Sequence, residues 1–109
     1  MDKQNALSAL GALSQESRLD VFRLLVRAGD NGLAAGDIAA YLNVRQNTMS
    51  THLGILTRAG MIHRKREGRS IRYAANYDGM RGLIVFLMSD CCRGVPEIVG
   101  PLADEFARA

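Results

Sequence analysis

The sequence predicts a mainly α-helical domain that carries one small β-hairpin (α+β), and three observations lead to this fold class. Over most of the chain, apolar residues recur three and four positions apart, which is the spacing of amphipathic helices. Two short strand-like runs flank Glu67-Gly68-Arg69, a tripeptide typical of a hairpin connection. The chain has 109 residues, of which 48% are hydrophobic, and this is enough for a single modest core. We therefore expect one domain over residues 1–109.

The N-terminal part of the chain predicts two helices. The first, over about residues 5–13, is indicated by a leucine every third position, at Leu7, Leu10 and Leu13. Ser14 follows it and is expected to cap the next helix, because serine is a favoured N-cap residue. That second helix is indicated by core-facing residues at Leu19, Phe22, Leu25 and Val26. It should end in the turn-rich segment 28–32.

Two further helices follow, joined by a short polar break. The first covers residues 35–43, with Ile38 and Leu42 one turn apart and Asn43 as its terminator. The second runs from Gln46 to Ala59, and Gly60 can close it. Its inner face is apolar, at Met49, Leu53 and Leu56. Its outer face is small and polar, at Asn47, Ser50, Thr51, Gly54 and Arg58. Because Glu and Lys form helices better than Asn, Ser, Thr or Gly, we infer that the outer face serves recognition.

The predicted hairpin lies in a strongly basic segment. Its strands are residues 61–66 and 70–74. Residues 45–72 hold one acid, Glu67, and seven basic residues: Arg45, Arg58, Arg64, Lys65, Arg66, Arg69 and Arg72. The rest of the chain has seven basic and ten acidic residues, so the basic charge is concentrated at one end. This charge distribution indicates a polyanionic partner.

A last helix, over about residues 78–92, is apolar nearly all round. A chain this small has little mass left to cover such a helix, so we expect a second copy to cover it. The homodimer would be held by the first and last helices, residues 5–13 and 78–92. Gly94 and Pro96 should end the last helix, which leaves residues 93–109 as a tail with at most a loose turn after Pro101.

The order of helix, turn, helix and basic hairpin predicts a winged helix-turn-helix unit over about residues 34–75. In such a unit the second helix reads base edges in the major groove, and flanking basic groups hold phosphates. The candidate reading residues are Gln46, Asn47, Thr48, Ser50 and Thr51. The candidate flanking contacts are Arg45, His52, Arg58, Lys65, Arg66 and Arg69. For His52, at the border of the reading helix, packing within the protein is the alternative to a phosphate contact. A winged helix that binds protein instead of DNA is the alternative.

Several segments together resemble the ArsR/SmtB family of bacterial repressors. They are Leu13 to Leu19, Arg45 to Leu56, Ala59-Gly60-Met61-Ile62 and Gly68 to Tyr73. Gly54 differs from the lysine that relatives often carry. The resemblance implies a homodimeric repressor that binds an inverted-repeat operator in double-stranded DNA and leaves it when an inducer binds.

The family places its sensing sites in different helices, so the inducer depends on which candidate ligands this chain carries. The cysteine box that some relatives carry before the reading helix is replaced by residues 36–42, which hold no thiol. The histidine-containing metal site of the last helix is also missing, since the two histidines, His52 and His63, lie elsewhere. Arsenic-responsive relatives often read Cys-Cys-x-Gly-x-Pro-Glu-x-Cys. This chain matches that pattern from Cys91 and Cys92 onward, with Val99 at the third cysteine.

The cysteine pair suggests a metalloid inducer. Soft thiolates prefer thiophilic acceptors, and an arsenical with one position blocked needs only two of them. We expect a trivalent arsenical, As(III), bound by Cys91 and Cys92, with an organoarsenical favoured over arsenite. Sulfurs from both protomers could also combine at one inorganic site. The alternatives are redox or persulfide sensing by the same pair, and two inert thiols.

Other classes of protein are disfavoured. No segment approaches the ~20 apolar residues of a membrane span, and the start of the chain lacks the form of a signal peptide, so a cytoplasmic protein without a membrane partner is expected. There is no Ser/His/Asp or Cys/His arrangement and no phosphate loop. We therefore expect no enzymatic activity and no required cofactor.

Overall fold

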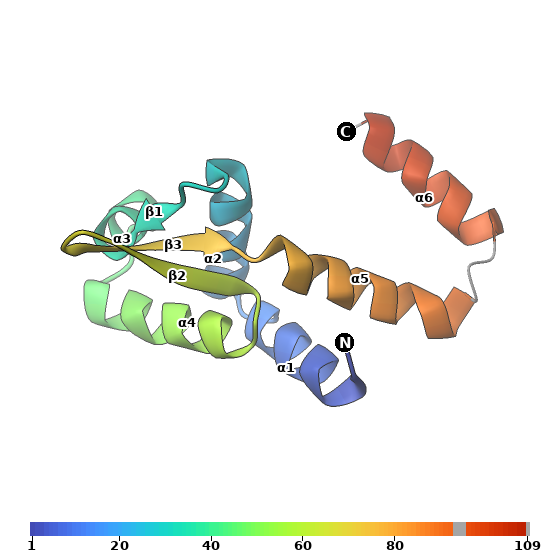
Figure 1. Cartoon of the computed structure of the whole chain (residues 1–109), viewed down its shortest axis with the longest axis horizontal. Helices are drawn as coiled ribbons and strands as arrows, with labels where there is room; N and C mark the ends of the chain where they lie inside the picture. Colours follow the sequence, from blue (N-terminus) through green and yellow to red (C-terminus); the bar gives the residue numbers. More distant parts are fainter. Residues whose placement is uncertain (93–95, 109) are drawn as a thin grey trace.

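The computed structural model describes the backbone of residues 1–92 and 96–108 and the side chains of residues 1–89 and 100–107. Its elements in chain order are α1 (Lys3–Leu13), α2 (Glu16–Ala28), β1 (Leu33–Ala34), α3 (Ala35–Leu42), α4 (Gln46–Arg58), β2 (Ile62–Glu67), β3 (Ser70–Ala75), α5 (Tyr77–Cys92) and α6 (Pro96–Arg108). A body of α1 to α4 and the sheet carries α5 as an arm, with α6 beyond its far end (Figure 1). The predicted fold class is confirmed.

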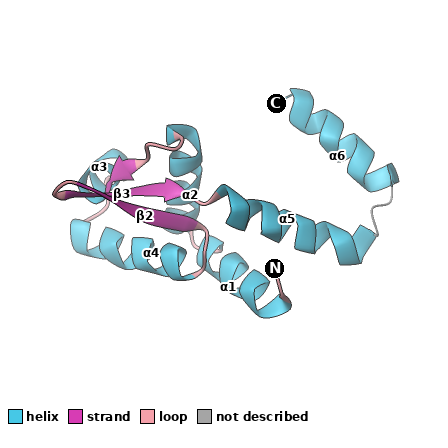
Figure 2. Ribbon diagram, in the orientation of Figure 1, coloured by secondary structure: helices cyan, strands magenta, loops and turns pink. Residues whose placement is uncertain are grey.

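The three strands form one antiparallel sheet in the order β1-β3-β2 (Figure 2). β2 and β3 pair from Ile62↔Ala75 to Glu67↔Ser70 and enclose a two-residue turn at Gly68-Arg69. The hairpin was predicted, whereas β1 was not, because a strand of two residues leaves no periodic pattern. β1 pairs with β3 at Leu33↔Tyr73 and so fixes the hairpin to the body.

The core lies where α1, α2, α3 and α4 meet the base of the sheet. Its largest fully buried side chains are Val21, Leu25, Ile38, Met49, Leu53, Leu56, Met61 and Ile62. From α1 the core takes alanines only: Ala6, Ala9 and Ala12. Leu7 and Leu10 of the predicted leucine stripe are 53% and 39% exposed. Leu7 and Leu10 therefore predicted the helix but face away from the chain's own core, whereas Leu13 packs against it.

Two details of the prediction were wrong. Ser14 does not cap α2, because it ends α1 and its hydroxyl donates to the Gly11 carbonyl oxygen (3.1 Å). Gln15 is the N-cap, and its Oε1 accepts from the Arg18 backbone N–H (2.9 Å). The tail is also not a loose turn, since residues 96–108 form α6. Proline suits the first position of a helix, so Pro96 begins α6, and Pro101 removes one backbone hydrogen bond without ending it.

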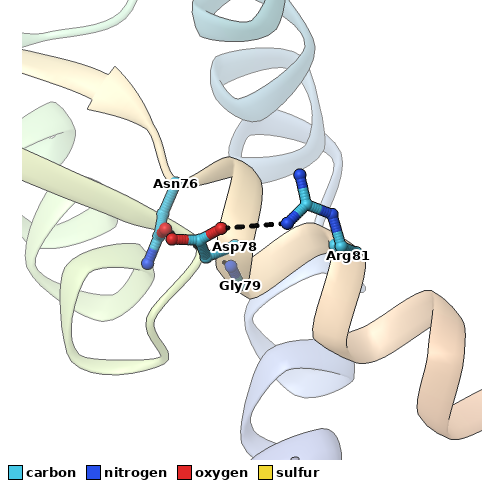
Figure 3. A network of polar contacts seen from close by, with 4 residues as sticks. All are labelled: Asn76, Asp78, Gly79 and Arg81. Carbon is cyan, nitrogen blue, oxygen red and sulfur yellow. Dashed lines mark hydrogen bonds and ion pairs between the residues drawn. The ribbon is translucent and has the colours of Figure 1, made fainter.

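Asn76 joins the hairpin to α5. Its Nδ2 donates to the Gly60 carbonyl oxygen (2.9 Å), and its Oδ1 accepts from the Gly79 backbone N–H (3.3 Å). One side chain thereby ties the end of β3 and the start of α5 to the turn after α4. Figure 3 also shows the ion pair of Asp78 and Arg81 (3.3 Å), which is solvent-exposed and adds little stability.

α5 buries little of its apolar surface against its own chain. Leu83 is its buried side chain among residues 77–89, whereas Ile84, Val85 and Leu87 are 42%, 57% and 43% exposed. Across the described residues, no helix has both the length and the apolar character that a membrane crossing requires.

Candidate nucleic-acid interface

α3 and α4 are set at an angle by a tight turn. Asn43 ends α3 in the left-handed conformation (φ 55°), and the Val44 N–H donates to the Ala39 carbonyl oxygen (2.9 Å). α4 is then fixed by Met49, Leu53 and Leu56, each 0% exposed. This burial confirms the predicted inner face and turns the opposite face of α4 toward solvent.

The five candidate reading residues of α4 are all exposed, and several are held by local hydrogen bonds. The Ser50 hydroxyl donates to the Gln46 carbonyl oxygen (3.0 Å), and the Thr51 hydroxyl donates to that of Asn47 (3.3 Å). The Asn47 Oδ1 accepts from the Thr48 backbone N–H (2.9 Å). A hydroxyl engaged in this way still has lone pairs that accept from a base. The exposed face is therefore ordered and still able to form hydrogen bonds.

Gln46 sits differently from its neighbours. The Gln46 side-chain amide lies close to Gly36 at the start of α3. A Cβ built onto Gly36 would be 3.2 Å from the Gln46 Nε2, so the amide packs where glycine has no side chain. Gln46 thereby bridges the two helices of the helix-turn-helix.

The hairpin projects from the body, since Ile62 is the buried side chain of β2 and the rest of that strand is exposed. Arg66 and Arg69 have no hydrogen-bond or ion-pair partner among the described residues. The Lys65 Nζ, in contrast, donates to the Asp30 carbonyl oxygen (3.0 Å). Two of the three predicted wing contacts are therefore free, and the third is engaged by the loop after α2.

Arg72 belongs to the basic segment, but the structure gives it another role. Its Nε donates to the Asn31 carbonyl oxygen and its Nη2 to that of Gly32, each at 2.9 Å. These bonds attach β3 to the loop between α2 and β1. Sequence reasoning missed this role because the acceptors are backbone atoms about forty residues away.

His52 lies at the junction of α4 with α2. The Arg18 Nη1 is 3.4 Å from the His52 Nδ1, and the Arg18 Nε donates to the Ala12 carbonyl oxygen (2.7 Å). Burial, and secondarily the positive charge of Arg18, lower the pKa of His52 below its ordinary value of 6.5. A ring packed in this way suits the packing role that was one of two expected for His52, the other being a phosphate contact.

Cys91 and Cys92 are the last residues of α5 as the structure describes it. Their side chains, the side chain of Val99 and the predicted break at Gly94 lie outside the described residues. Within the described part of the chain, no group of three or more His, Cys, Asp or Glu residues could hold a metal ion.

Comparison with known proteins agrees with this geometry. A family model described as a helix-turn-helix domain matches residues 13–65. The transcriptional repressor SdpR of Bacillus subtilis is 32% identical over 83 residues, which cover 76% of this chain and 89% of SdpR. The transcriptional activator HlyU of Vibrio cholerae is 27% identical over 95 residues, or 85% of each chain.

Two solved structures extend the likeness to three dimensions. Reduced HlyU from Vibrio cholerae matches with a TM-score of 0.62 and 27% identity, over 82% of this chain and 90% of that one. The homodimeric winged helix-turn-helix DNA-binding domain of Mb0332 from Mycobacterium bovis, described as a possible ArsR-family regulator, matches with a TM-score of 0.66 and 26% identity over 80% of each chain.

The fold and the exposed face of α4 thus define a winged helix-turn-helix DNA-binding regulator. The chain belongs to the ArsR family. Its relatives are named as transcriptional regulators, so the protein is a regulator of transcription rather than an enzyme, and the protein-binding alternative loses its support.

Proposed function

We propose that this protein is a homodimeric repressor that reads an inverted-repeat operator with α4 and releases it when a trivalent arsenical binds Cys91 and Cys92. The observation that supports DNA reading most strongly is the pairing of an exposed polar face on α4 with a projecting basic hairpin. The repressor SdpR is a relative of this chain, which favours repression as the direction of control.

Each part of the interface has its own role in this proposal. Asn47, Ser50 and Thr51 contact base edges, and Gln46 joins them. A bidentate amide contact to adenine gives roughly 1–3 kcal/mol of discrimination. Arg66 and Arg69 hold phosphates, which contributes affinity but no sequence preference.

The dimer would bury the apolar surface that α1 and α5 leave exposed. These two helices contact each other, and both expose large apolar side chains: Leu7 and Leu10 on α1, and Ile84, Val85 and Leu87 on α5. An apolar surface of this extent on so small a chain is typical of an interface between copies. The homodimeric Mb0332 domain supports the same assembly here.

The cysteine pair lies at the end of the helix proposed to form the dimer. An arsenical bound to the two thiolates would change the last turn of α5, and with it the separation of the two α4 helices. A coupling free energy of about 1–3 kcal/mol between arsenical binding and DNA binding would lower the affinity for the operator roughly 5–150-fold. This is enough to release the protein from its operator. Two thiolates suit an arsenical with one blocked position, which favours a methylated or arylated form over arsenite.

Redox or persulfide sensing by the same pair is the second candidate. It is favoured by HlyU, a relative whose solved structures include one described as reduced. In this alternative an inorganic polysulfide is the oxidant: it donates the bridging sulfur of a trisulfide between the two cysteines and leaves as hydrogen sulfide. The trisulfide would act on the same turn of α5 and release DNA in the same way.

Fluorescence anisotropy separates these candidates. A labelled duplex, selected from a random pool by the native protein, is titrated at fixed salt with methylarsenite, arsenite, polysulfide and zinc. We expect methylarsenite to release the native protein from this duplex. We expect Cys91→Ser and Cys92→Ser to bind the duplex normally but to stay bound. Serine variants that respond like the native protein would overturn the sensing proposal, and release by polysulfide alone would favour the second candidate.

A further inference from the structure

A cationic hollow lies between the outer face of α4 and the hairpin, and it adjoins the residues proposed to read bases through Ser50. It has a volume of about 240 Å³ and is lined by Ser50, Gly54, Thr57, Arg58, Arg64 and Tyr73. Arg64 and Tyr73 are directly paired across β2 and β3, so they present one face of the hairpin to α4. The hollow is therefore continuous with both parts of the DNA-binding surface.

Gly54 stands in the middle of α4 with no packing role that explains it. Glycine is one of the least favourable residues inside a helix, second only to proline. A Cβ added there would meet one side chain, the Arg58 guanidinium, whose Nη1 would lie 3.3 Å away. The bare backbone at Gly54 therefore opens into the hollow and is bordered by a positive charge.

The charge of the hollow is unbalanced. Arg58 and Arg64 are exposed, and neither has a hydrogen-bond or ion-pair partner among the described residues. No carboxylate belongs to the lining, so the two guanidinium groups remain uncompensated. Guanidinium groups bind phosphate oxygens through paired N–H donors, and glycine is the residue that permits close approach of a ligand to the backbone.

We propose that this hollow seats one phosphodiester of the DNA backbone, on the ridge between the major groove entered by α4 and the minor groove beside the hairpin. This proposal rests on DNA binding by α4. Arg58 holds the phosphate from the helix side and Arg64 from the hairpin side. Gly54 keeps the floor of the hollow free of a side chain, so that the phosphate approaches the helix.

The salt dependence of DNA binding tests the role of Arg58. Affinity for a selected and for a random duplex is measured between 50 and 200 mM salt for the native protein, Arg58→Gln and Arg23→Gln. Arg23 is an exposed cation on α2, so its variant removes the same charge outside the hollow. We expect Arg58→Gln to lower the slope of log affinity against log salt on both duplexes, by up to about 0.9 per hollow because Arg64 still faces the same phosphate. That is up to about 3.5-fold less loss of affinity per hollow across this range. Arg23→Gln should keep the native slope.

Gly54→Ala tests the floor of the hollow. Alanine forms helices better and meets only a flexible side chain, so the melting temperature should not fall and should rise modestly. Binding to every duplex should nevertheless weaken, because the methyl group occupies the phosphate position. If Gly54→Ala binds DNA with the affinity of the native protein, the proposed role of the glycine is wrong. If Arg58→Gln keeps the native slope of log affinity against log salt, the hollow is not a phosphate site. A native protein that binds no duplex would instead overturn DNA reading itself.

Discussion

The attachment of the hairpin to the body depends on Gly32, and Gly32→Ala tests this packing directly. Gly32 has a φ of 64°, which costs an L-residue about 1–2 kcal/mol. A Cβ at this position would also overlap the Tyr73 carbonyl oxygen, a backbone atom of β3 that cannot move without disturbing the Leu33↔Tyr73 pair. Forcing an extra carbon into a packed site costs a further 1–3 kcal/mol or so. We therefore expect Gly32→Ala to lower the free energy of unfolding by roughly 2–5 kcal/mol.

Gly68→Ala is the matched control, because Gly68 has nearly the same φ (61°) but an added Cβ there meets nothing within 4 Å. Its loss should be about 1–2 kcal/mol, from the backbone conformation alone. The assay is urea unfolding followed by far-ultraviolet circular dichroism, at one fixed protein concentration because a dimer's stability depends on it. Equal losses in the two variants would refute the close packing of the loop on β3.

The remaining predictions concern single side chains. The pKa of His52 is lowered in the folded protein, so the unfolded chain binds the proton first and stability falls as the pH drops below about 6.5. The melting temperature should therefore fall more steeply from pH 6.5 to 5 in the native protein than in His52→Asn, and parallel profiles would contradict a His52 pKa that burial and Arg18 lower. Arg72→Met should lower the free energy of urea unfolding by about 1–3 kcal/mol, because it removes the hydrogen bonds of Arg72 to the loop carbonyls. It should keep the native salt slope of DNA binding. A reduced slope would place Arg72 on DNA instead. Leu53→Ala should lower the free energy of unfolding by about 2–5 kcal/mol in the same assay, because Leu53 is fully buried. A loss of stability under about 1 kcal/mol would show that Leu53 does not anchor α4 to the core.

The elements with long, regular patterns were predictable from the sequence. α4 was expected from Gln46 to Ala59 and runs over Gln46–Arg58, with the expected residues buried. The hairpin was also predictable, because two β-rich runs enclose a glycine turn. α1 shows the limit of this reasoning, since both its leucines and its alanines recur every third residue. Which stripe faces the protomer's own core depends on how closely α2 and α4 approach, and that distance is not encoded locally.

The site was predictable in its charge and polarity but not in its connections. The basic segment and the polar face of α4 were found from composition and helical period. The bonds of Lys65 and Arg72 to the loop at residues 30–32, and that of Arg18 to His52, join segments more than thirty residues apart. Such contacts are set by the tertiary fold. The hollow beside Gly54 likewise exists only because the hairpin folds back against α4.

The most direct test of DNA reading by α4 is the ratio of affinities for a selected duplex and a scrambled one, measured at several salt concentrations. We predict that Asn47→Ala and Ser50→Ala lower this ratio and keep the native salt slope, since they remove hydrogen bonds to bases. Arg66→Gln and Arg69→Gln should weaken both duplexes equally and lower the slope by about 0.9 for each phosphate that is no longer neutralised. Equal losses on both duplexes from all four variants would contradict the division of roles in which α4 reads sequence while the hairpin holds the backbone.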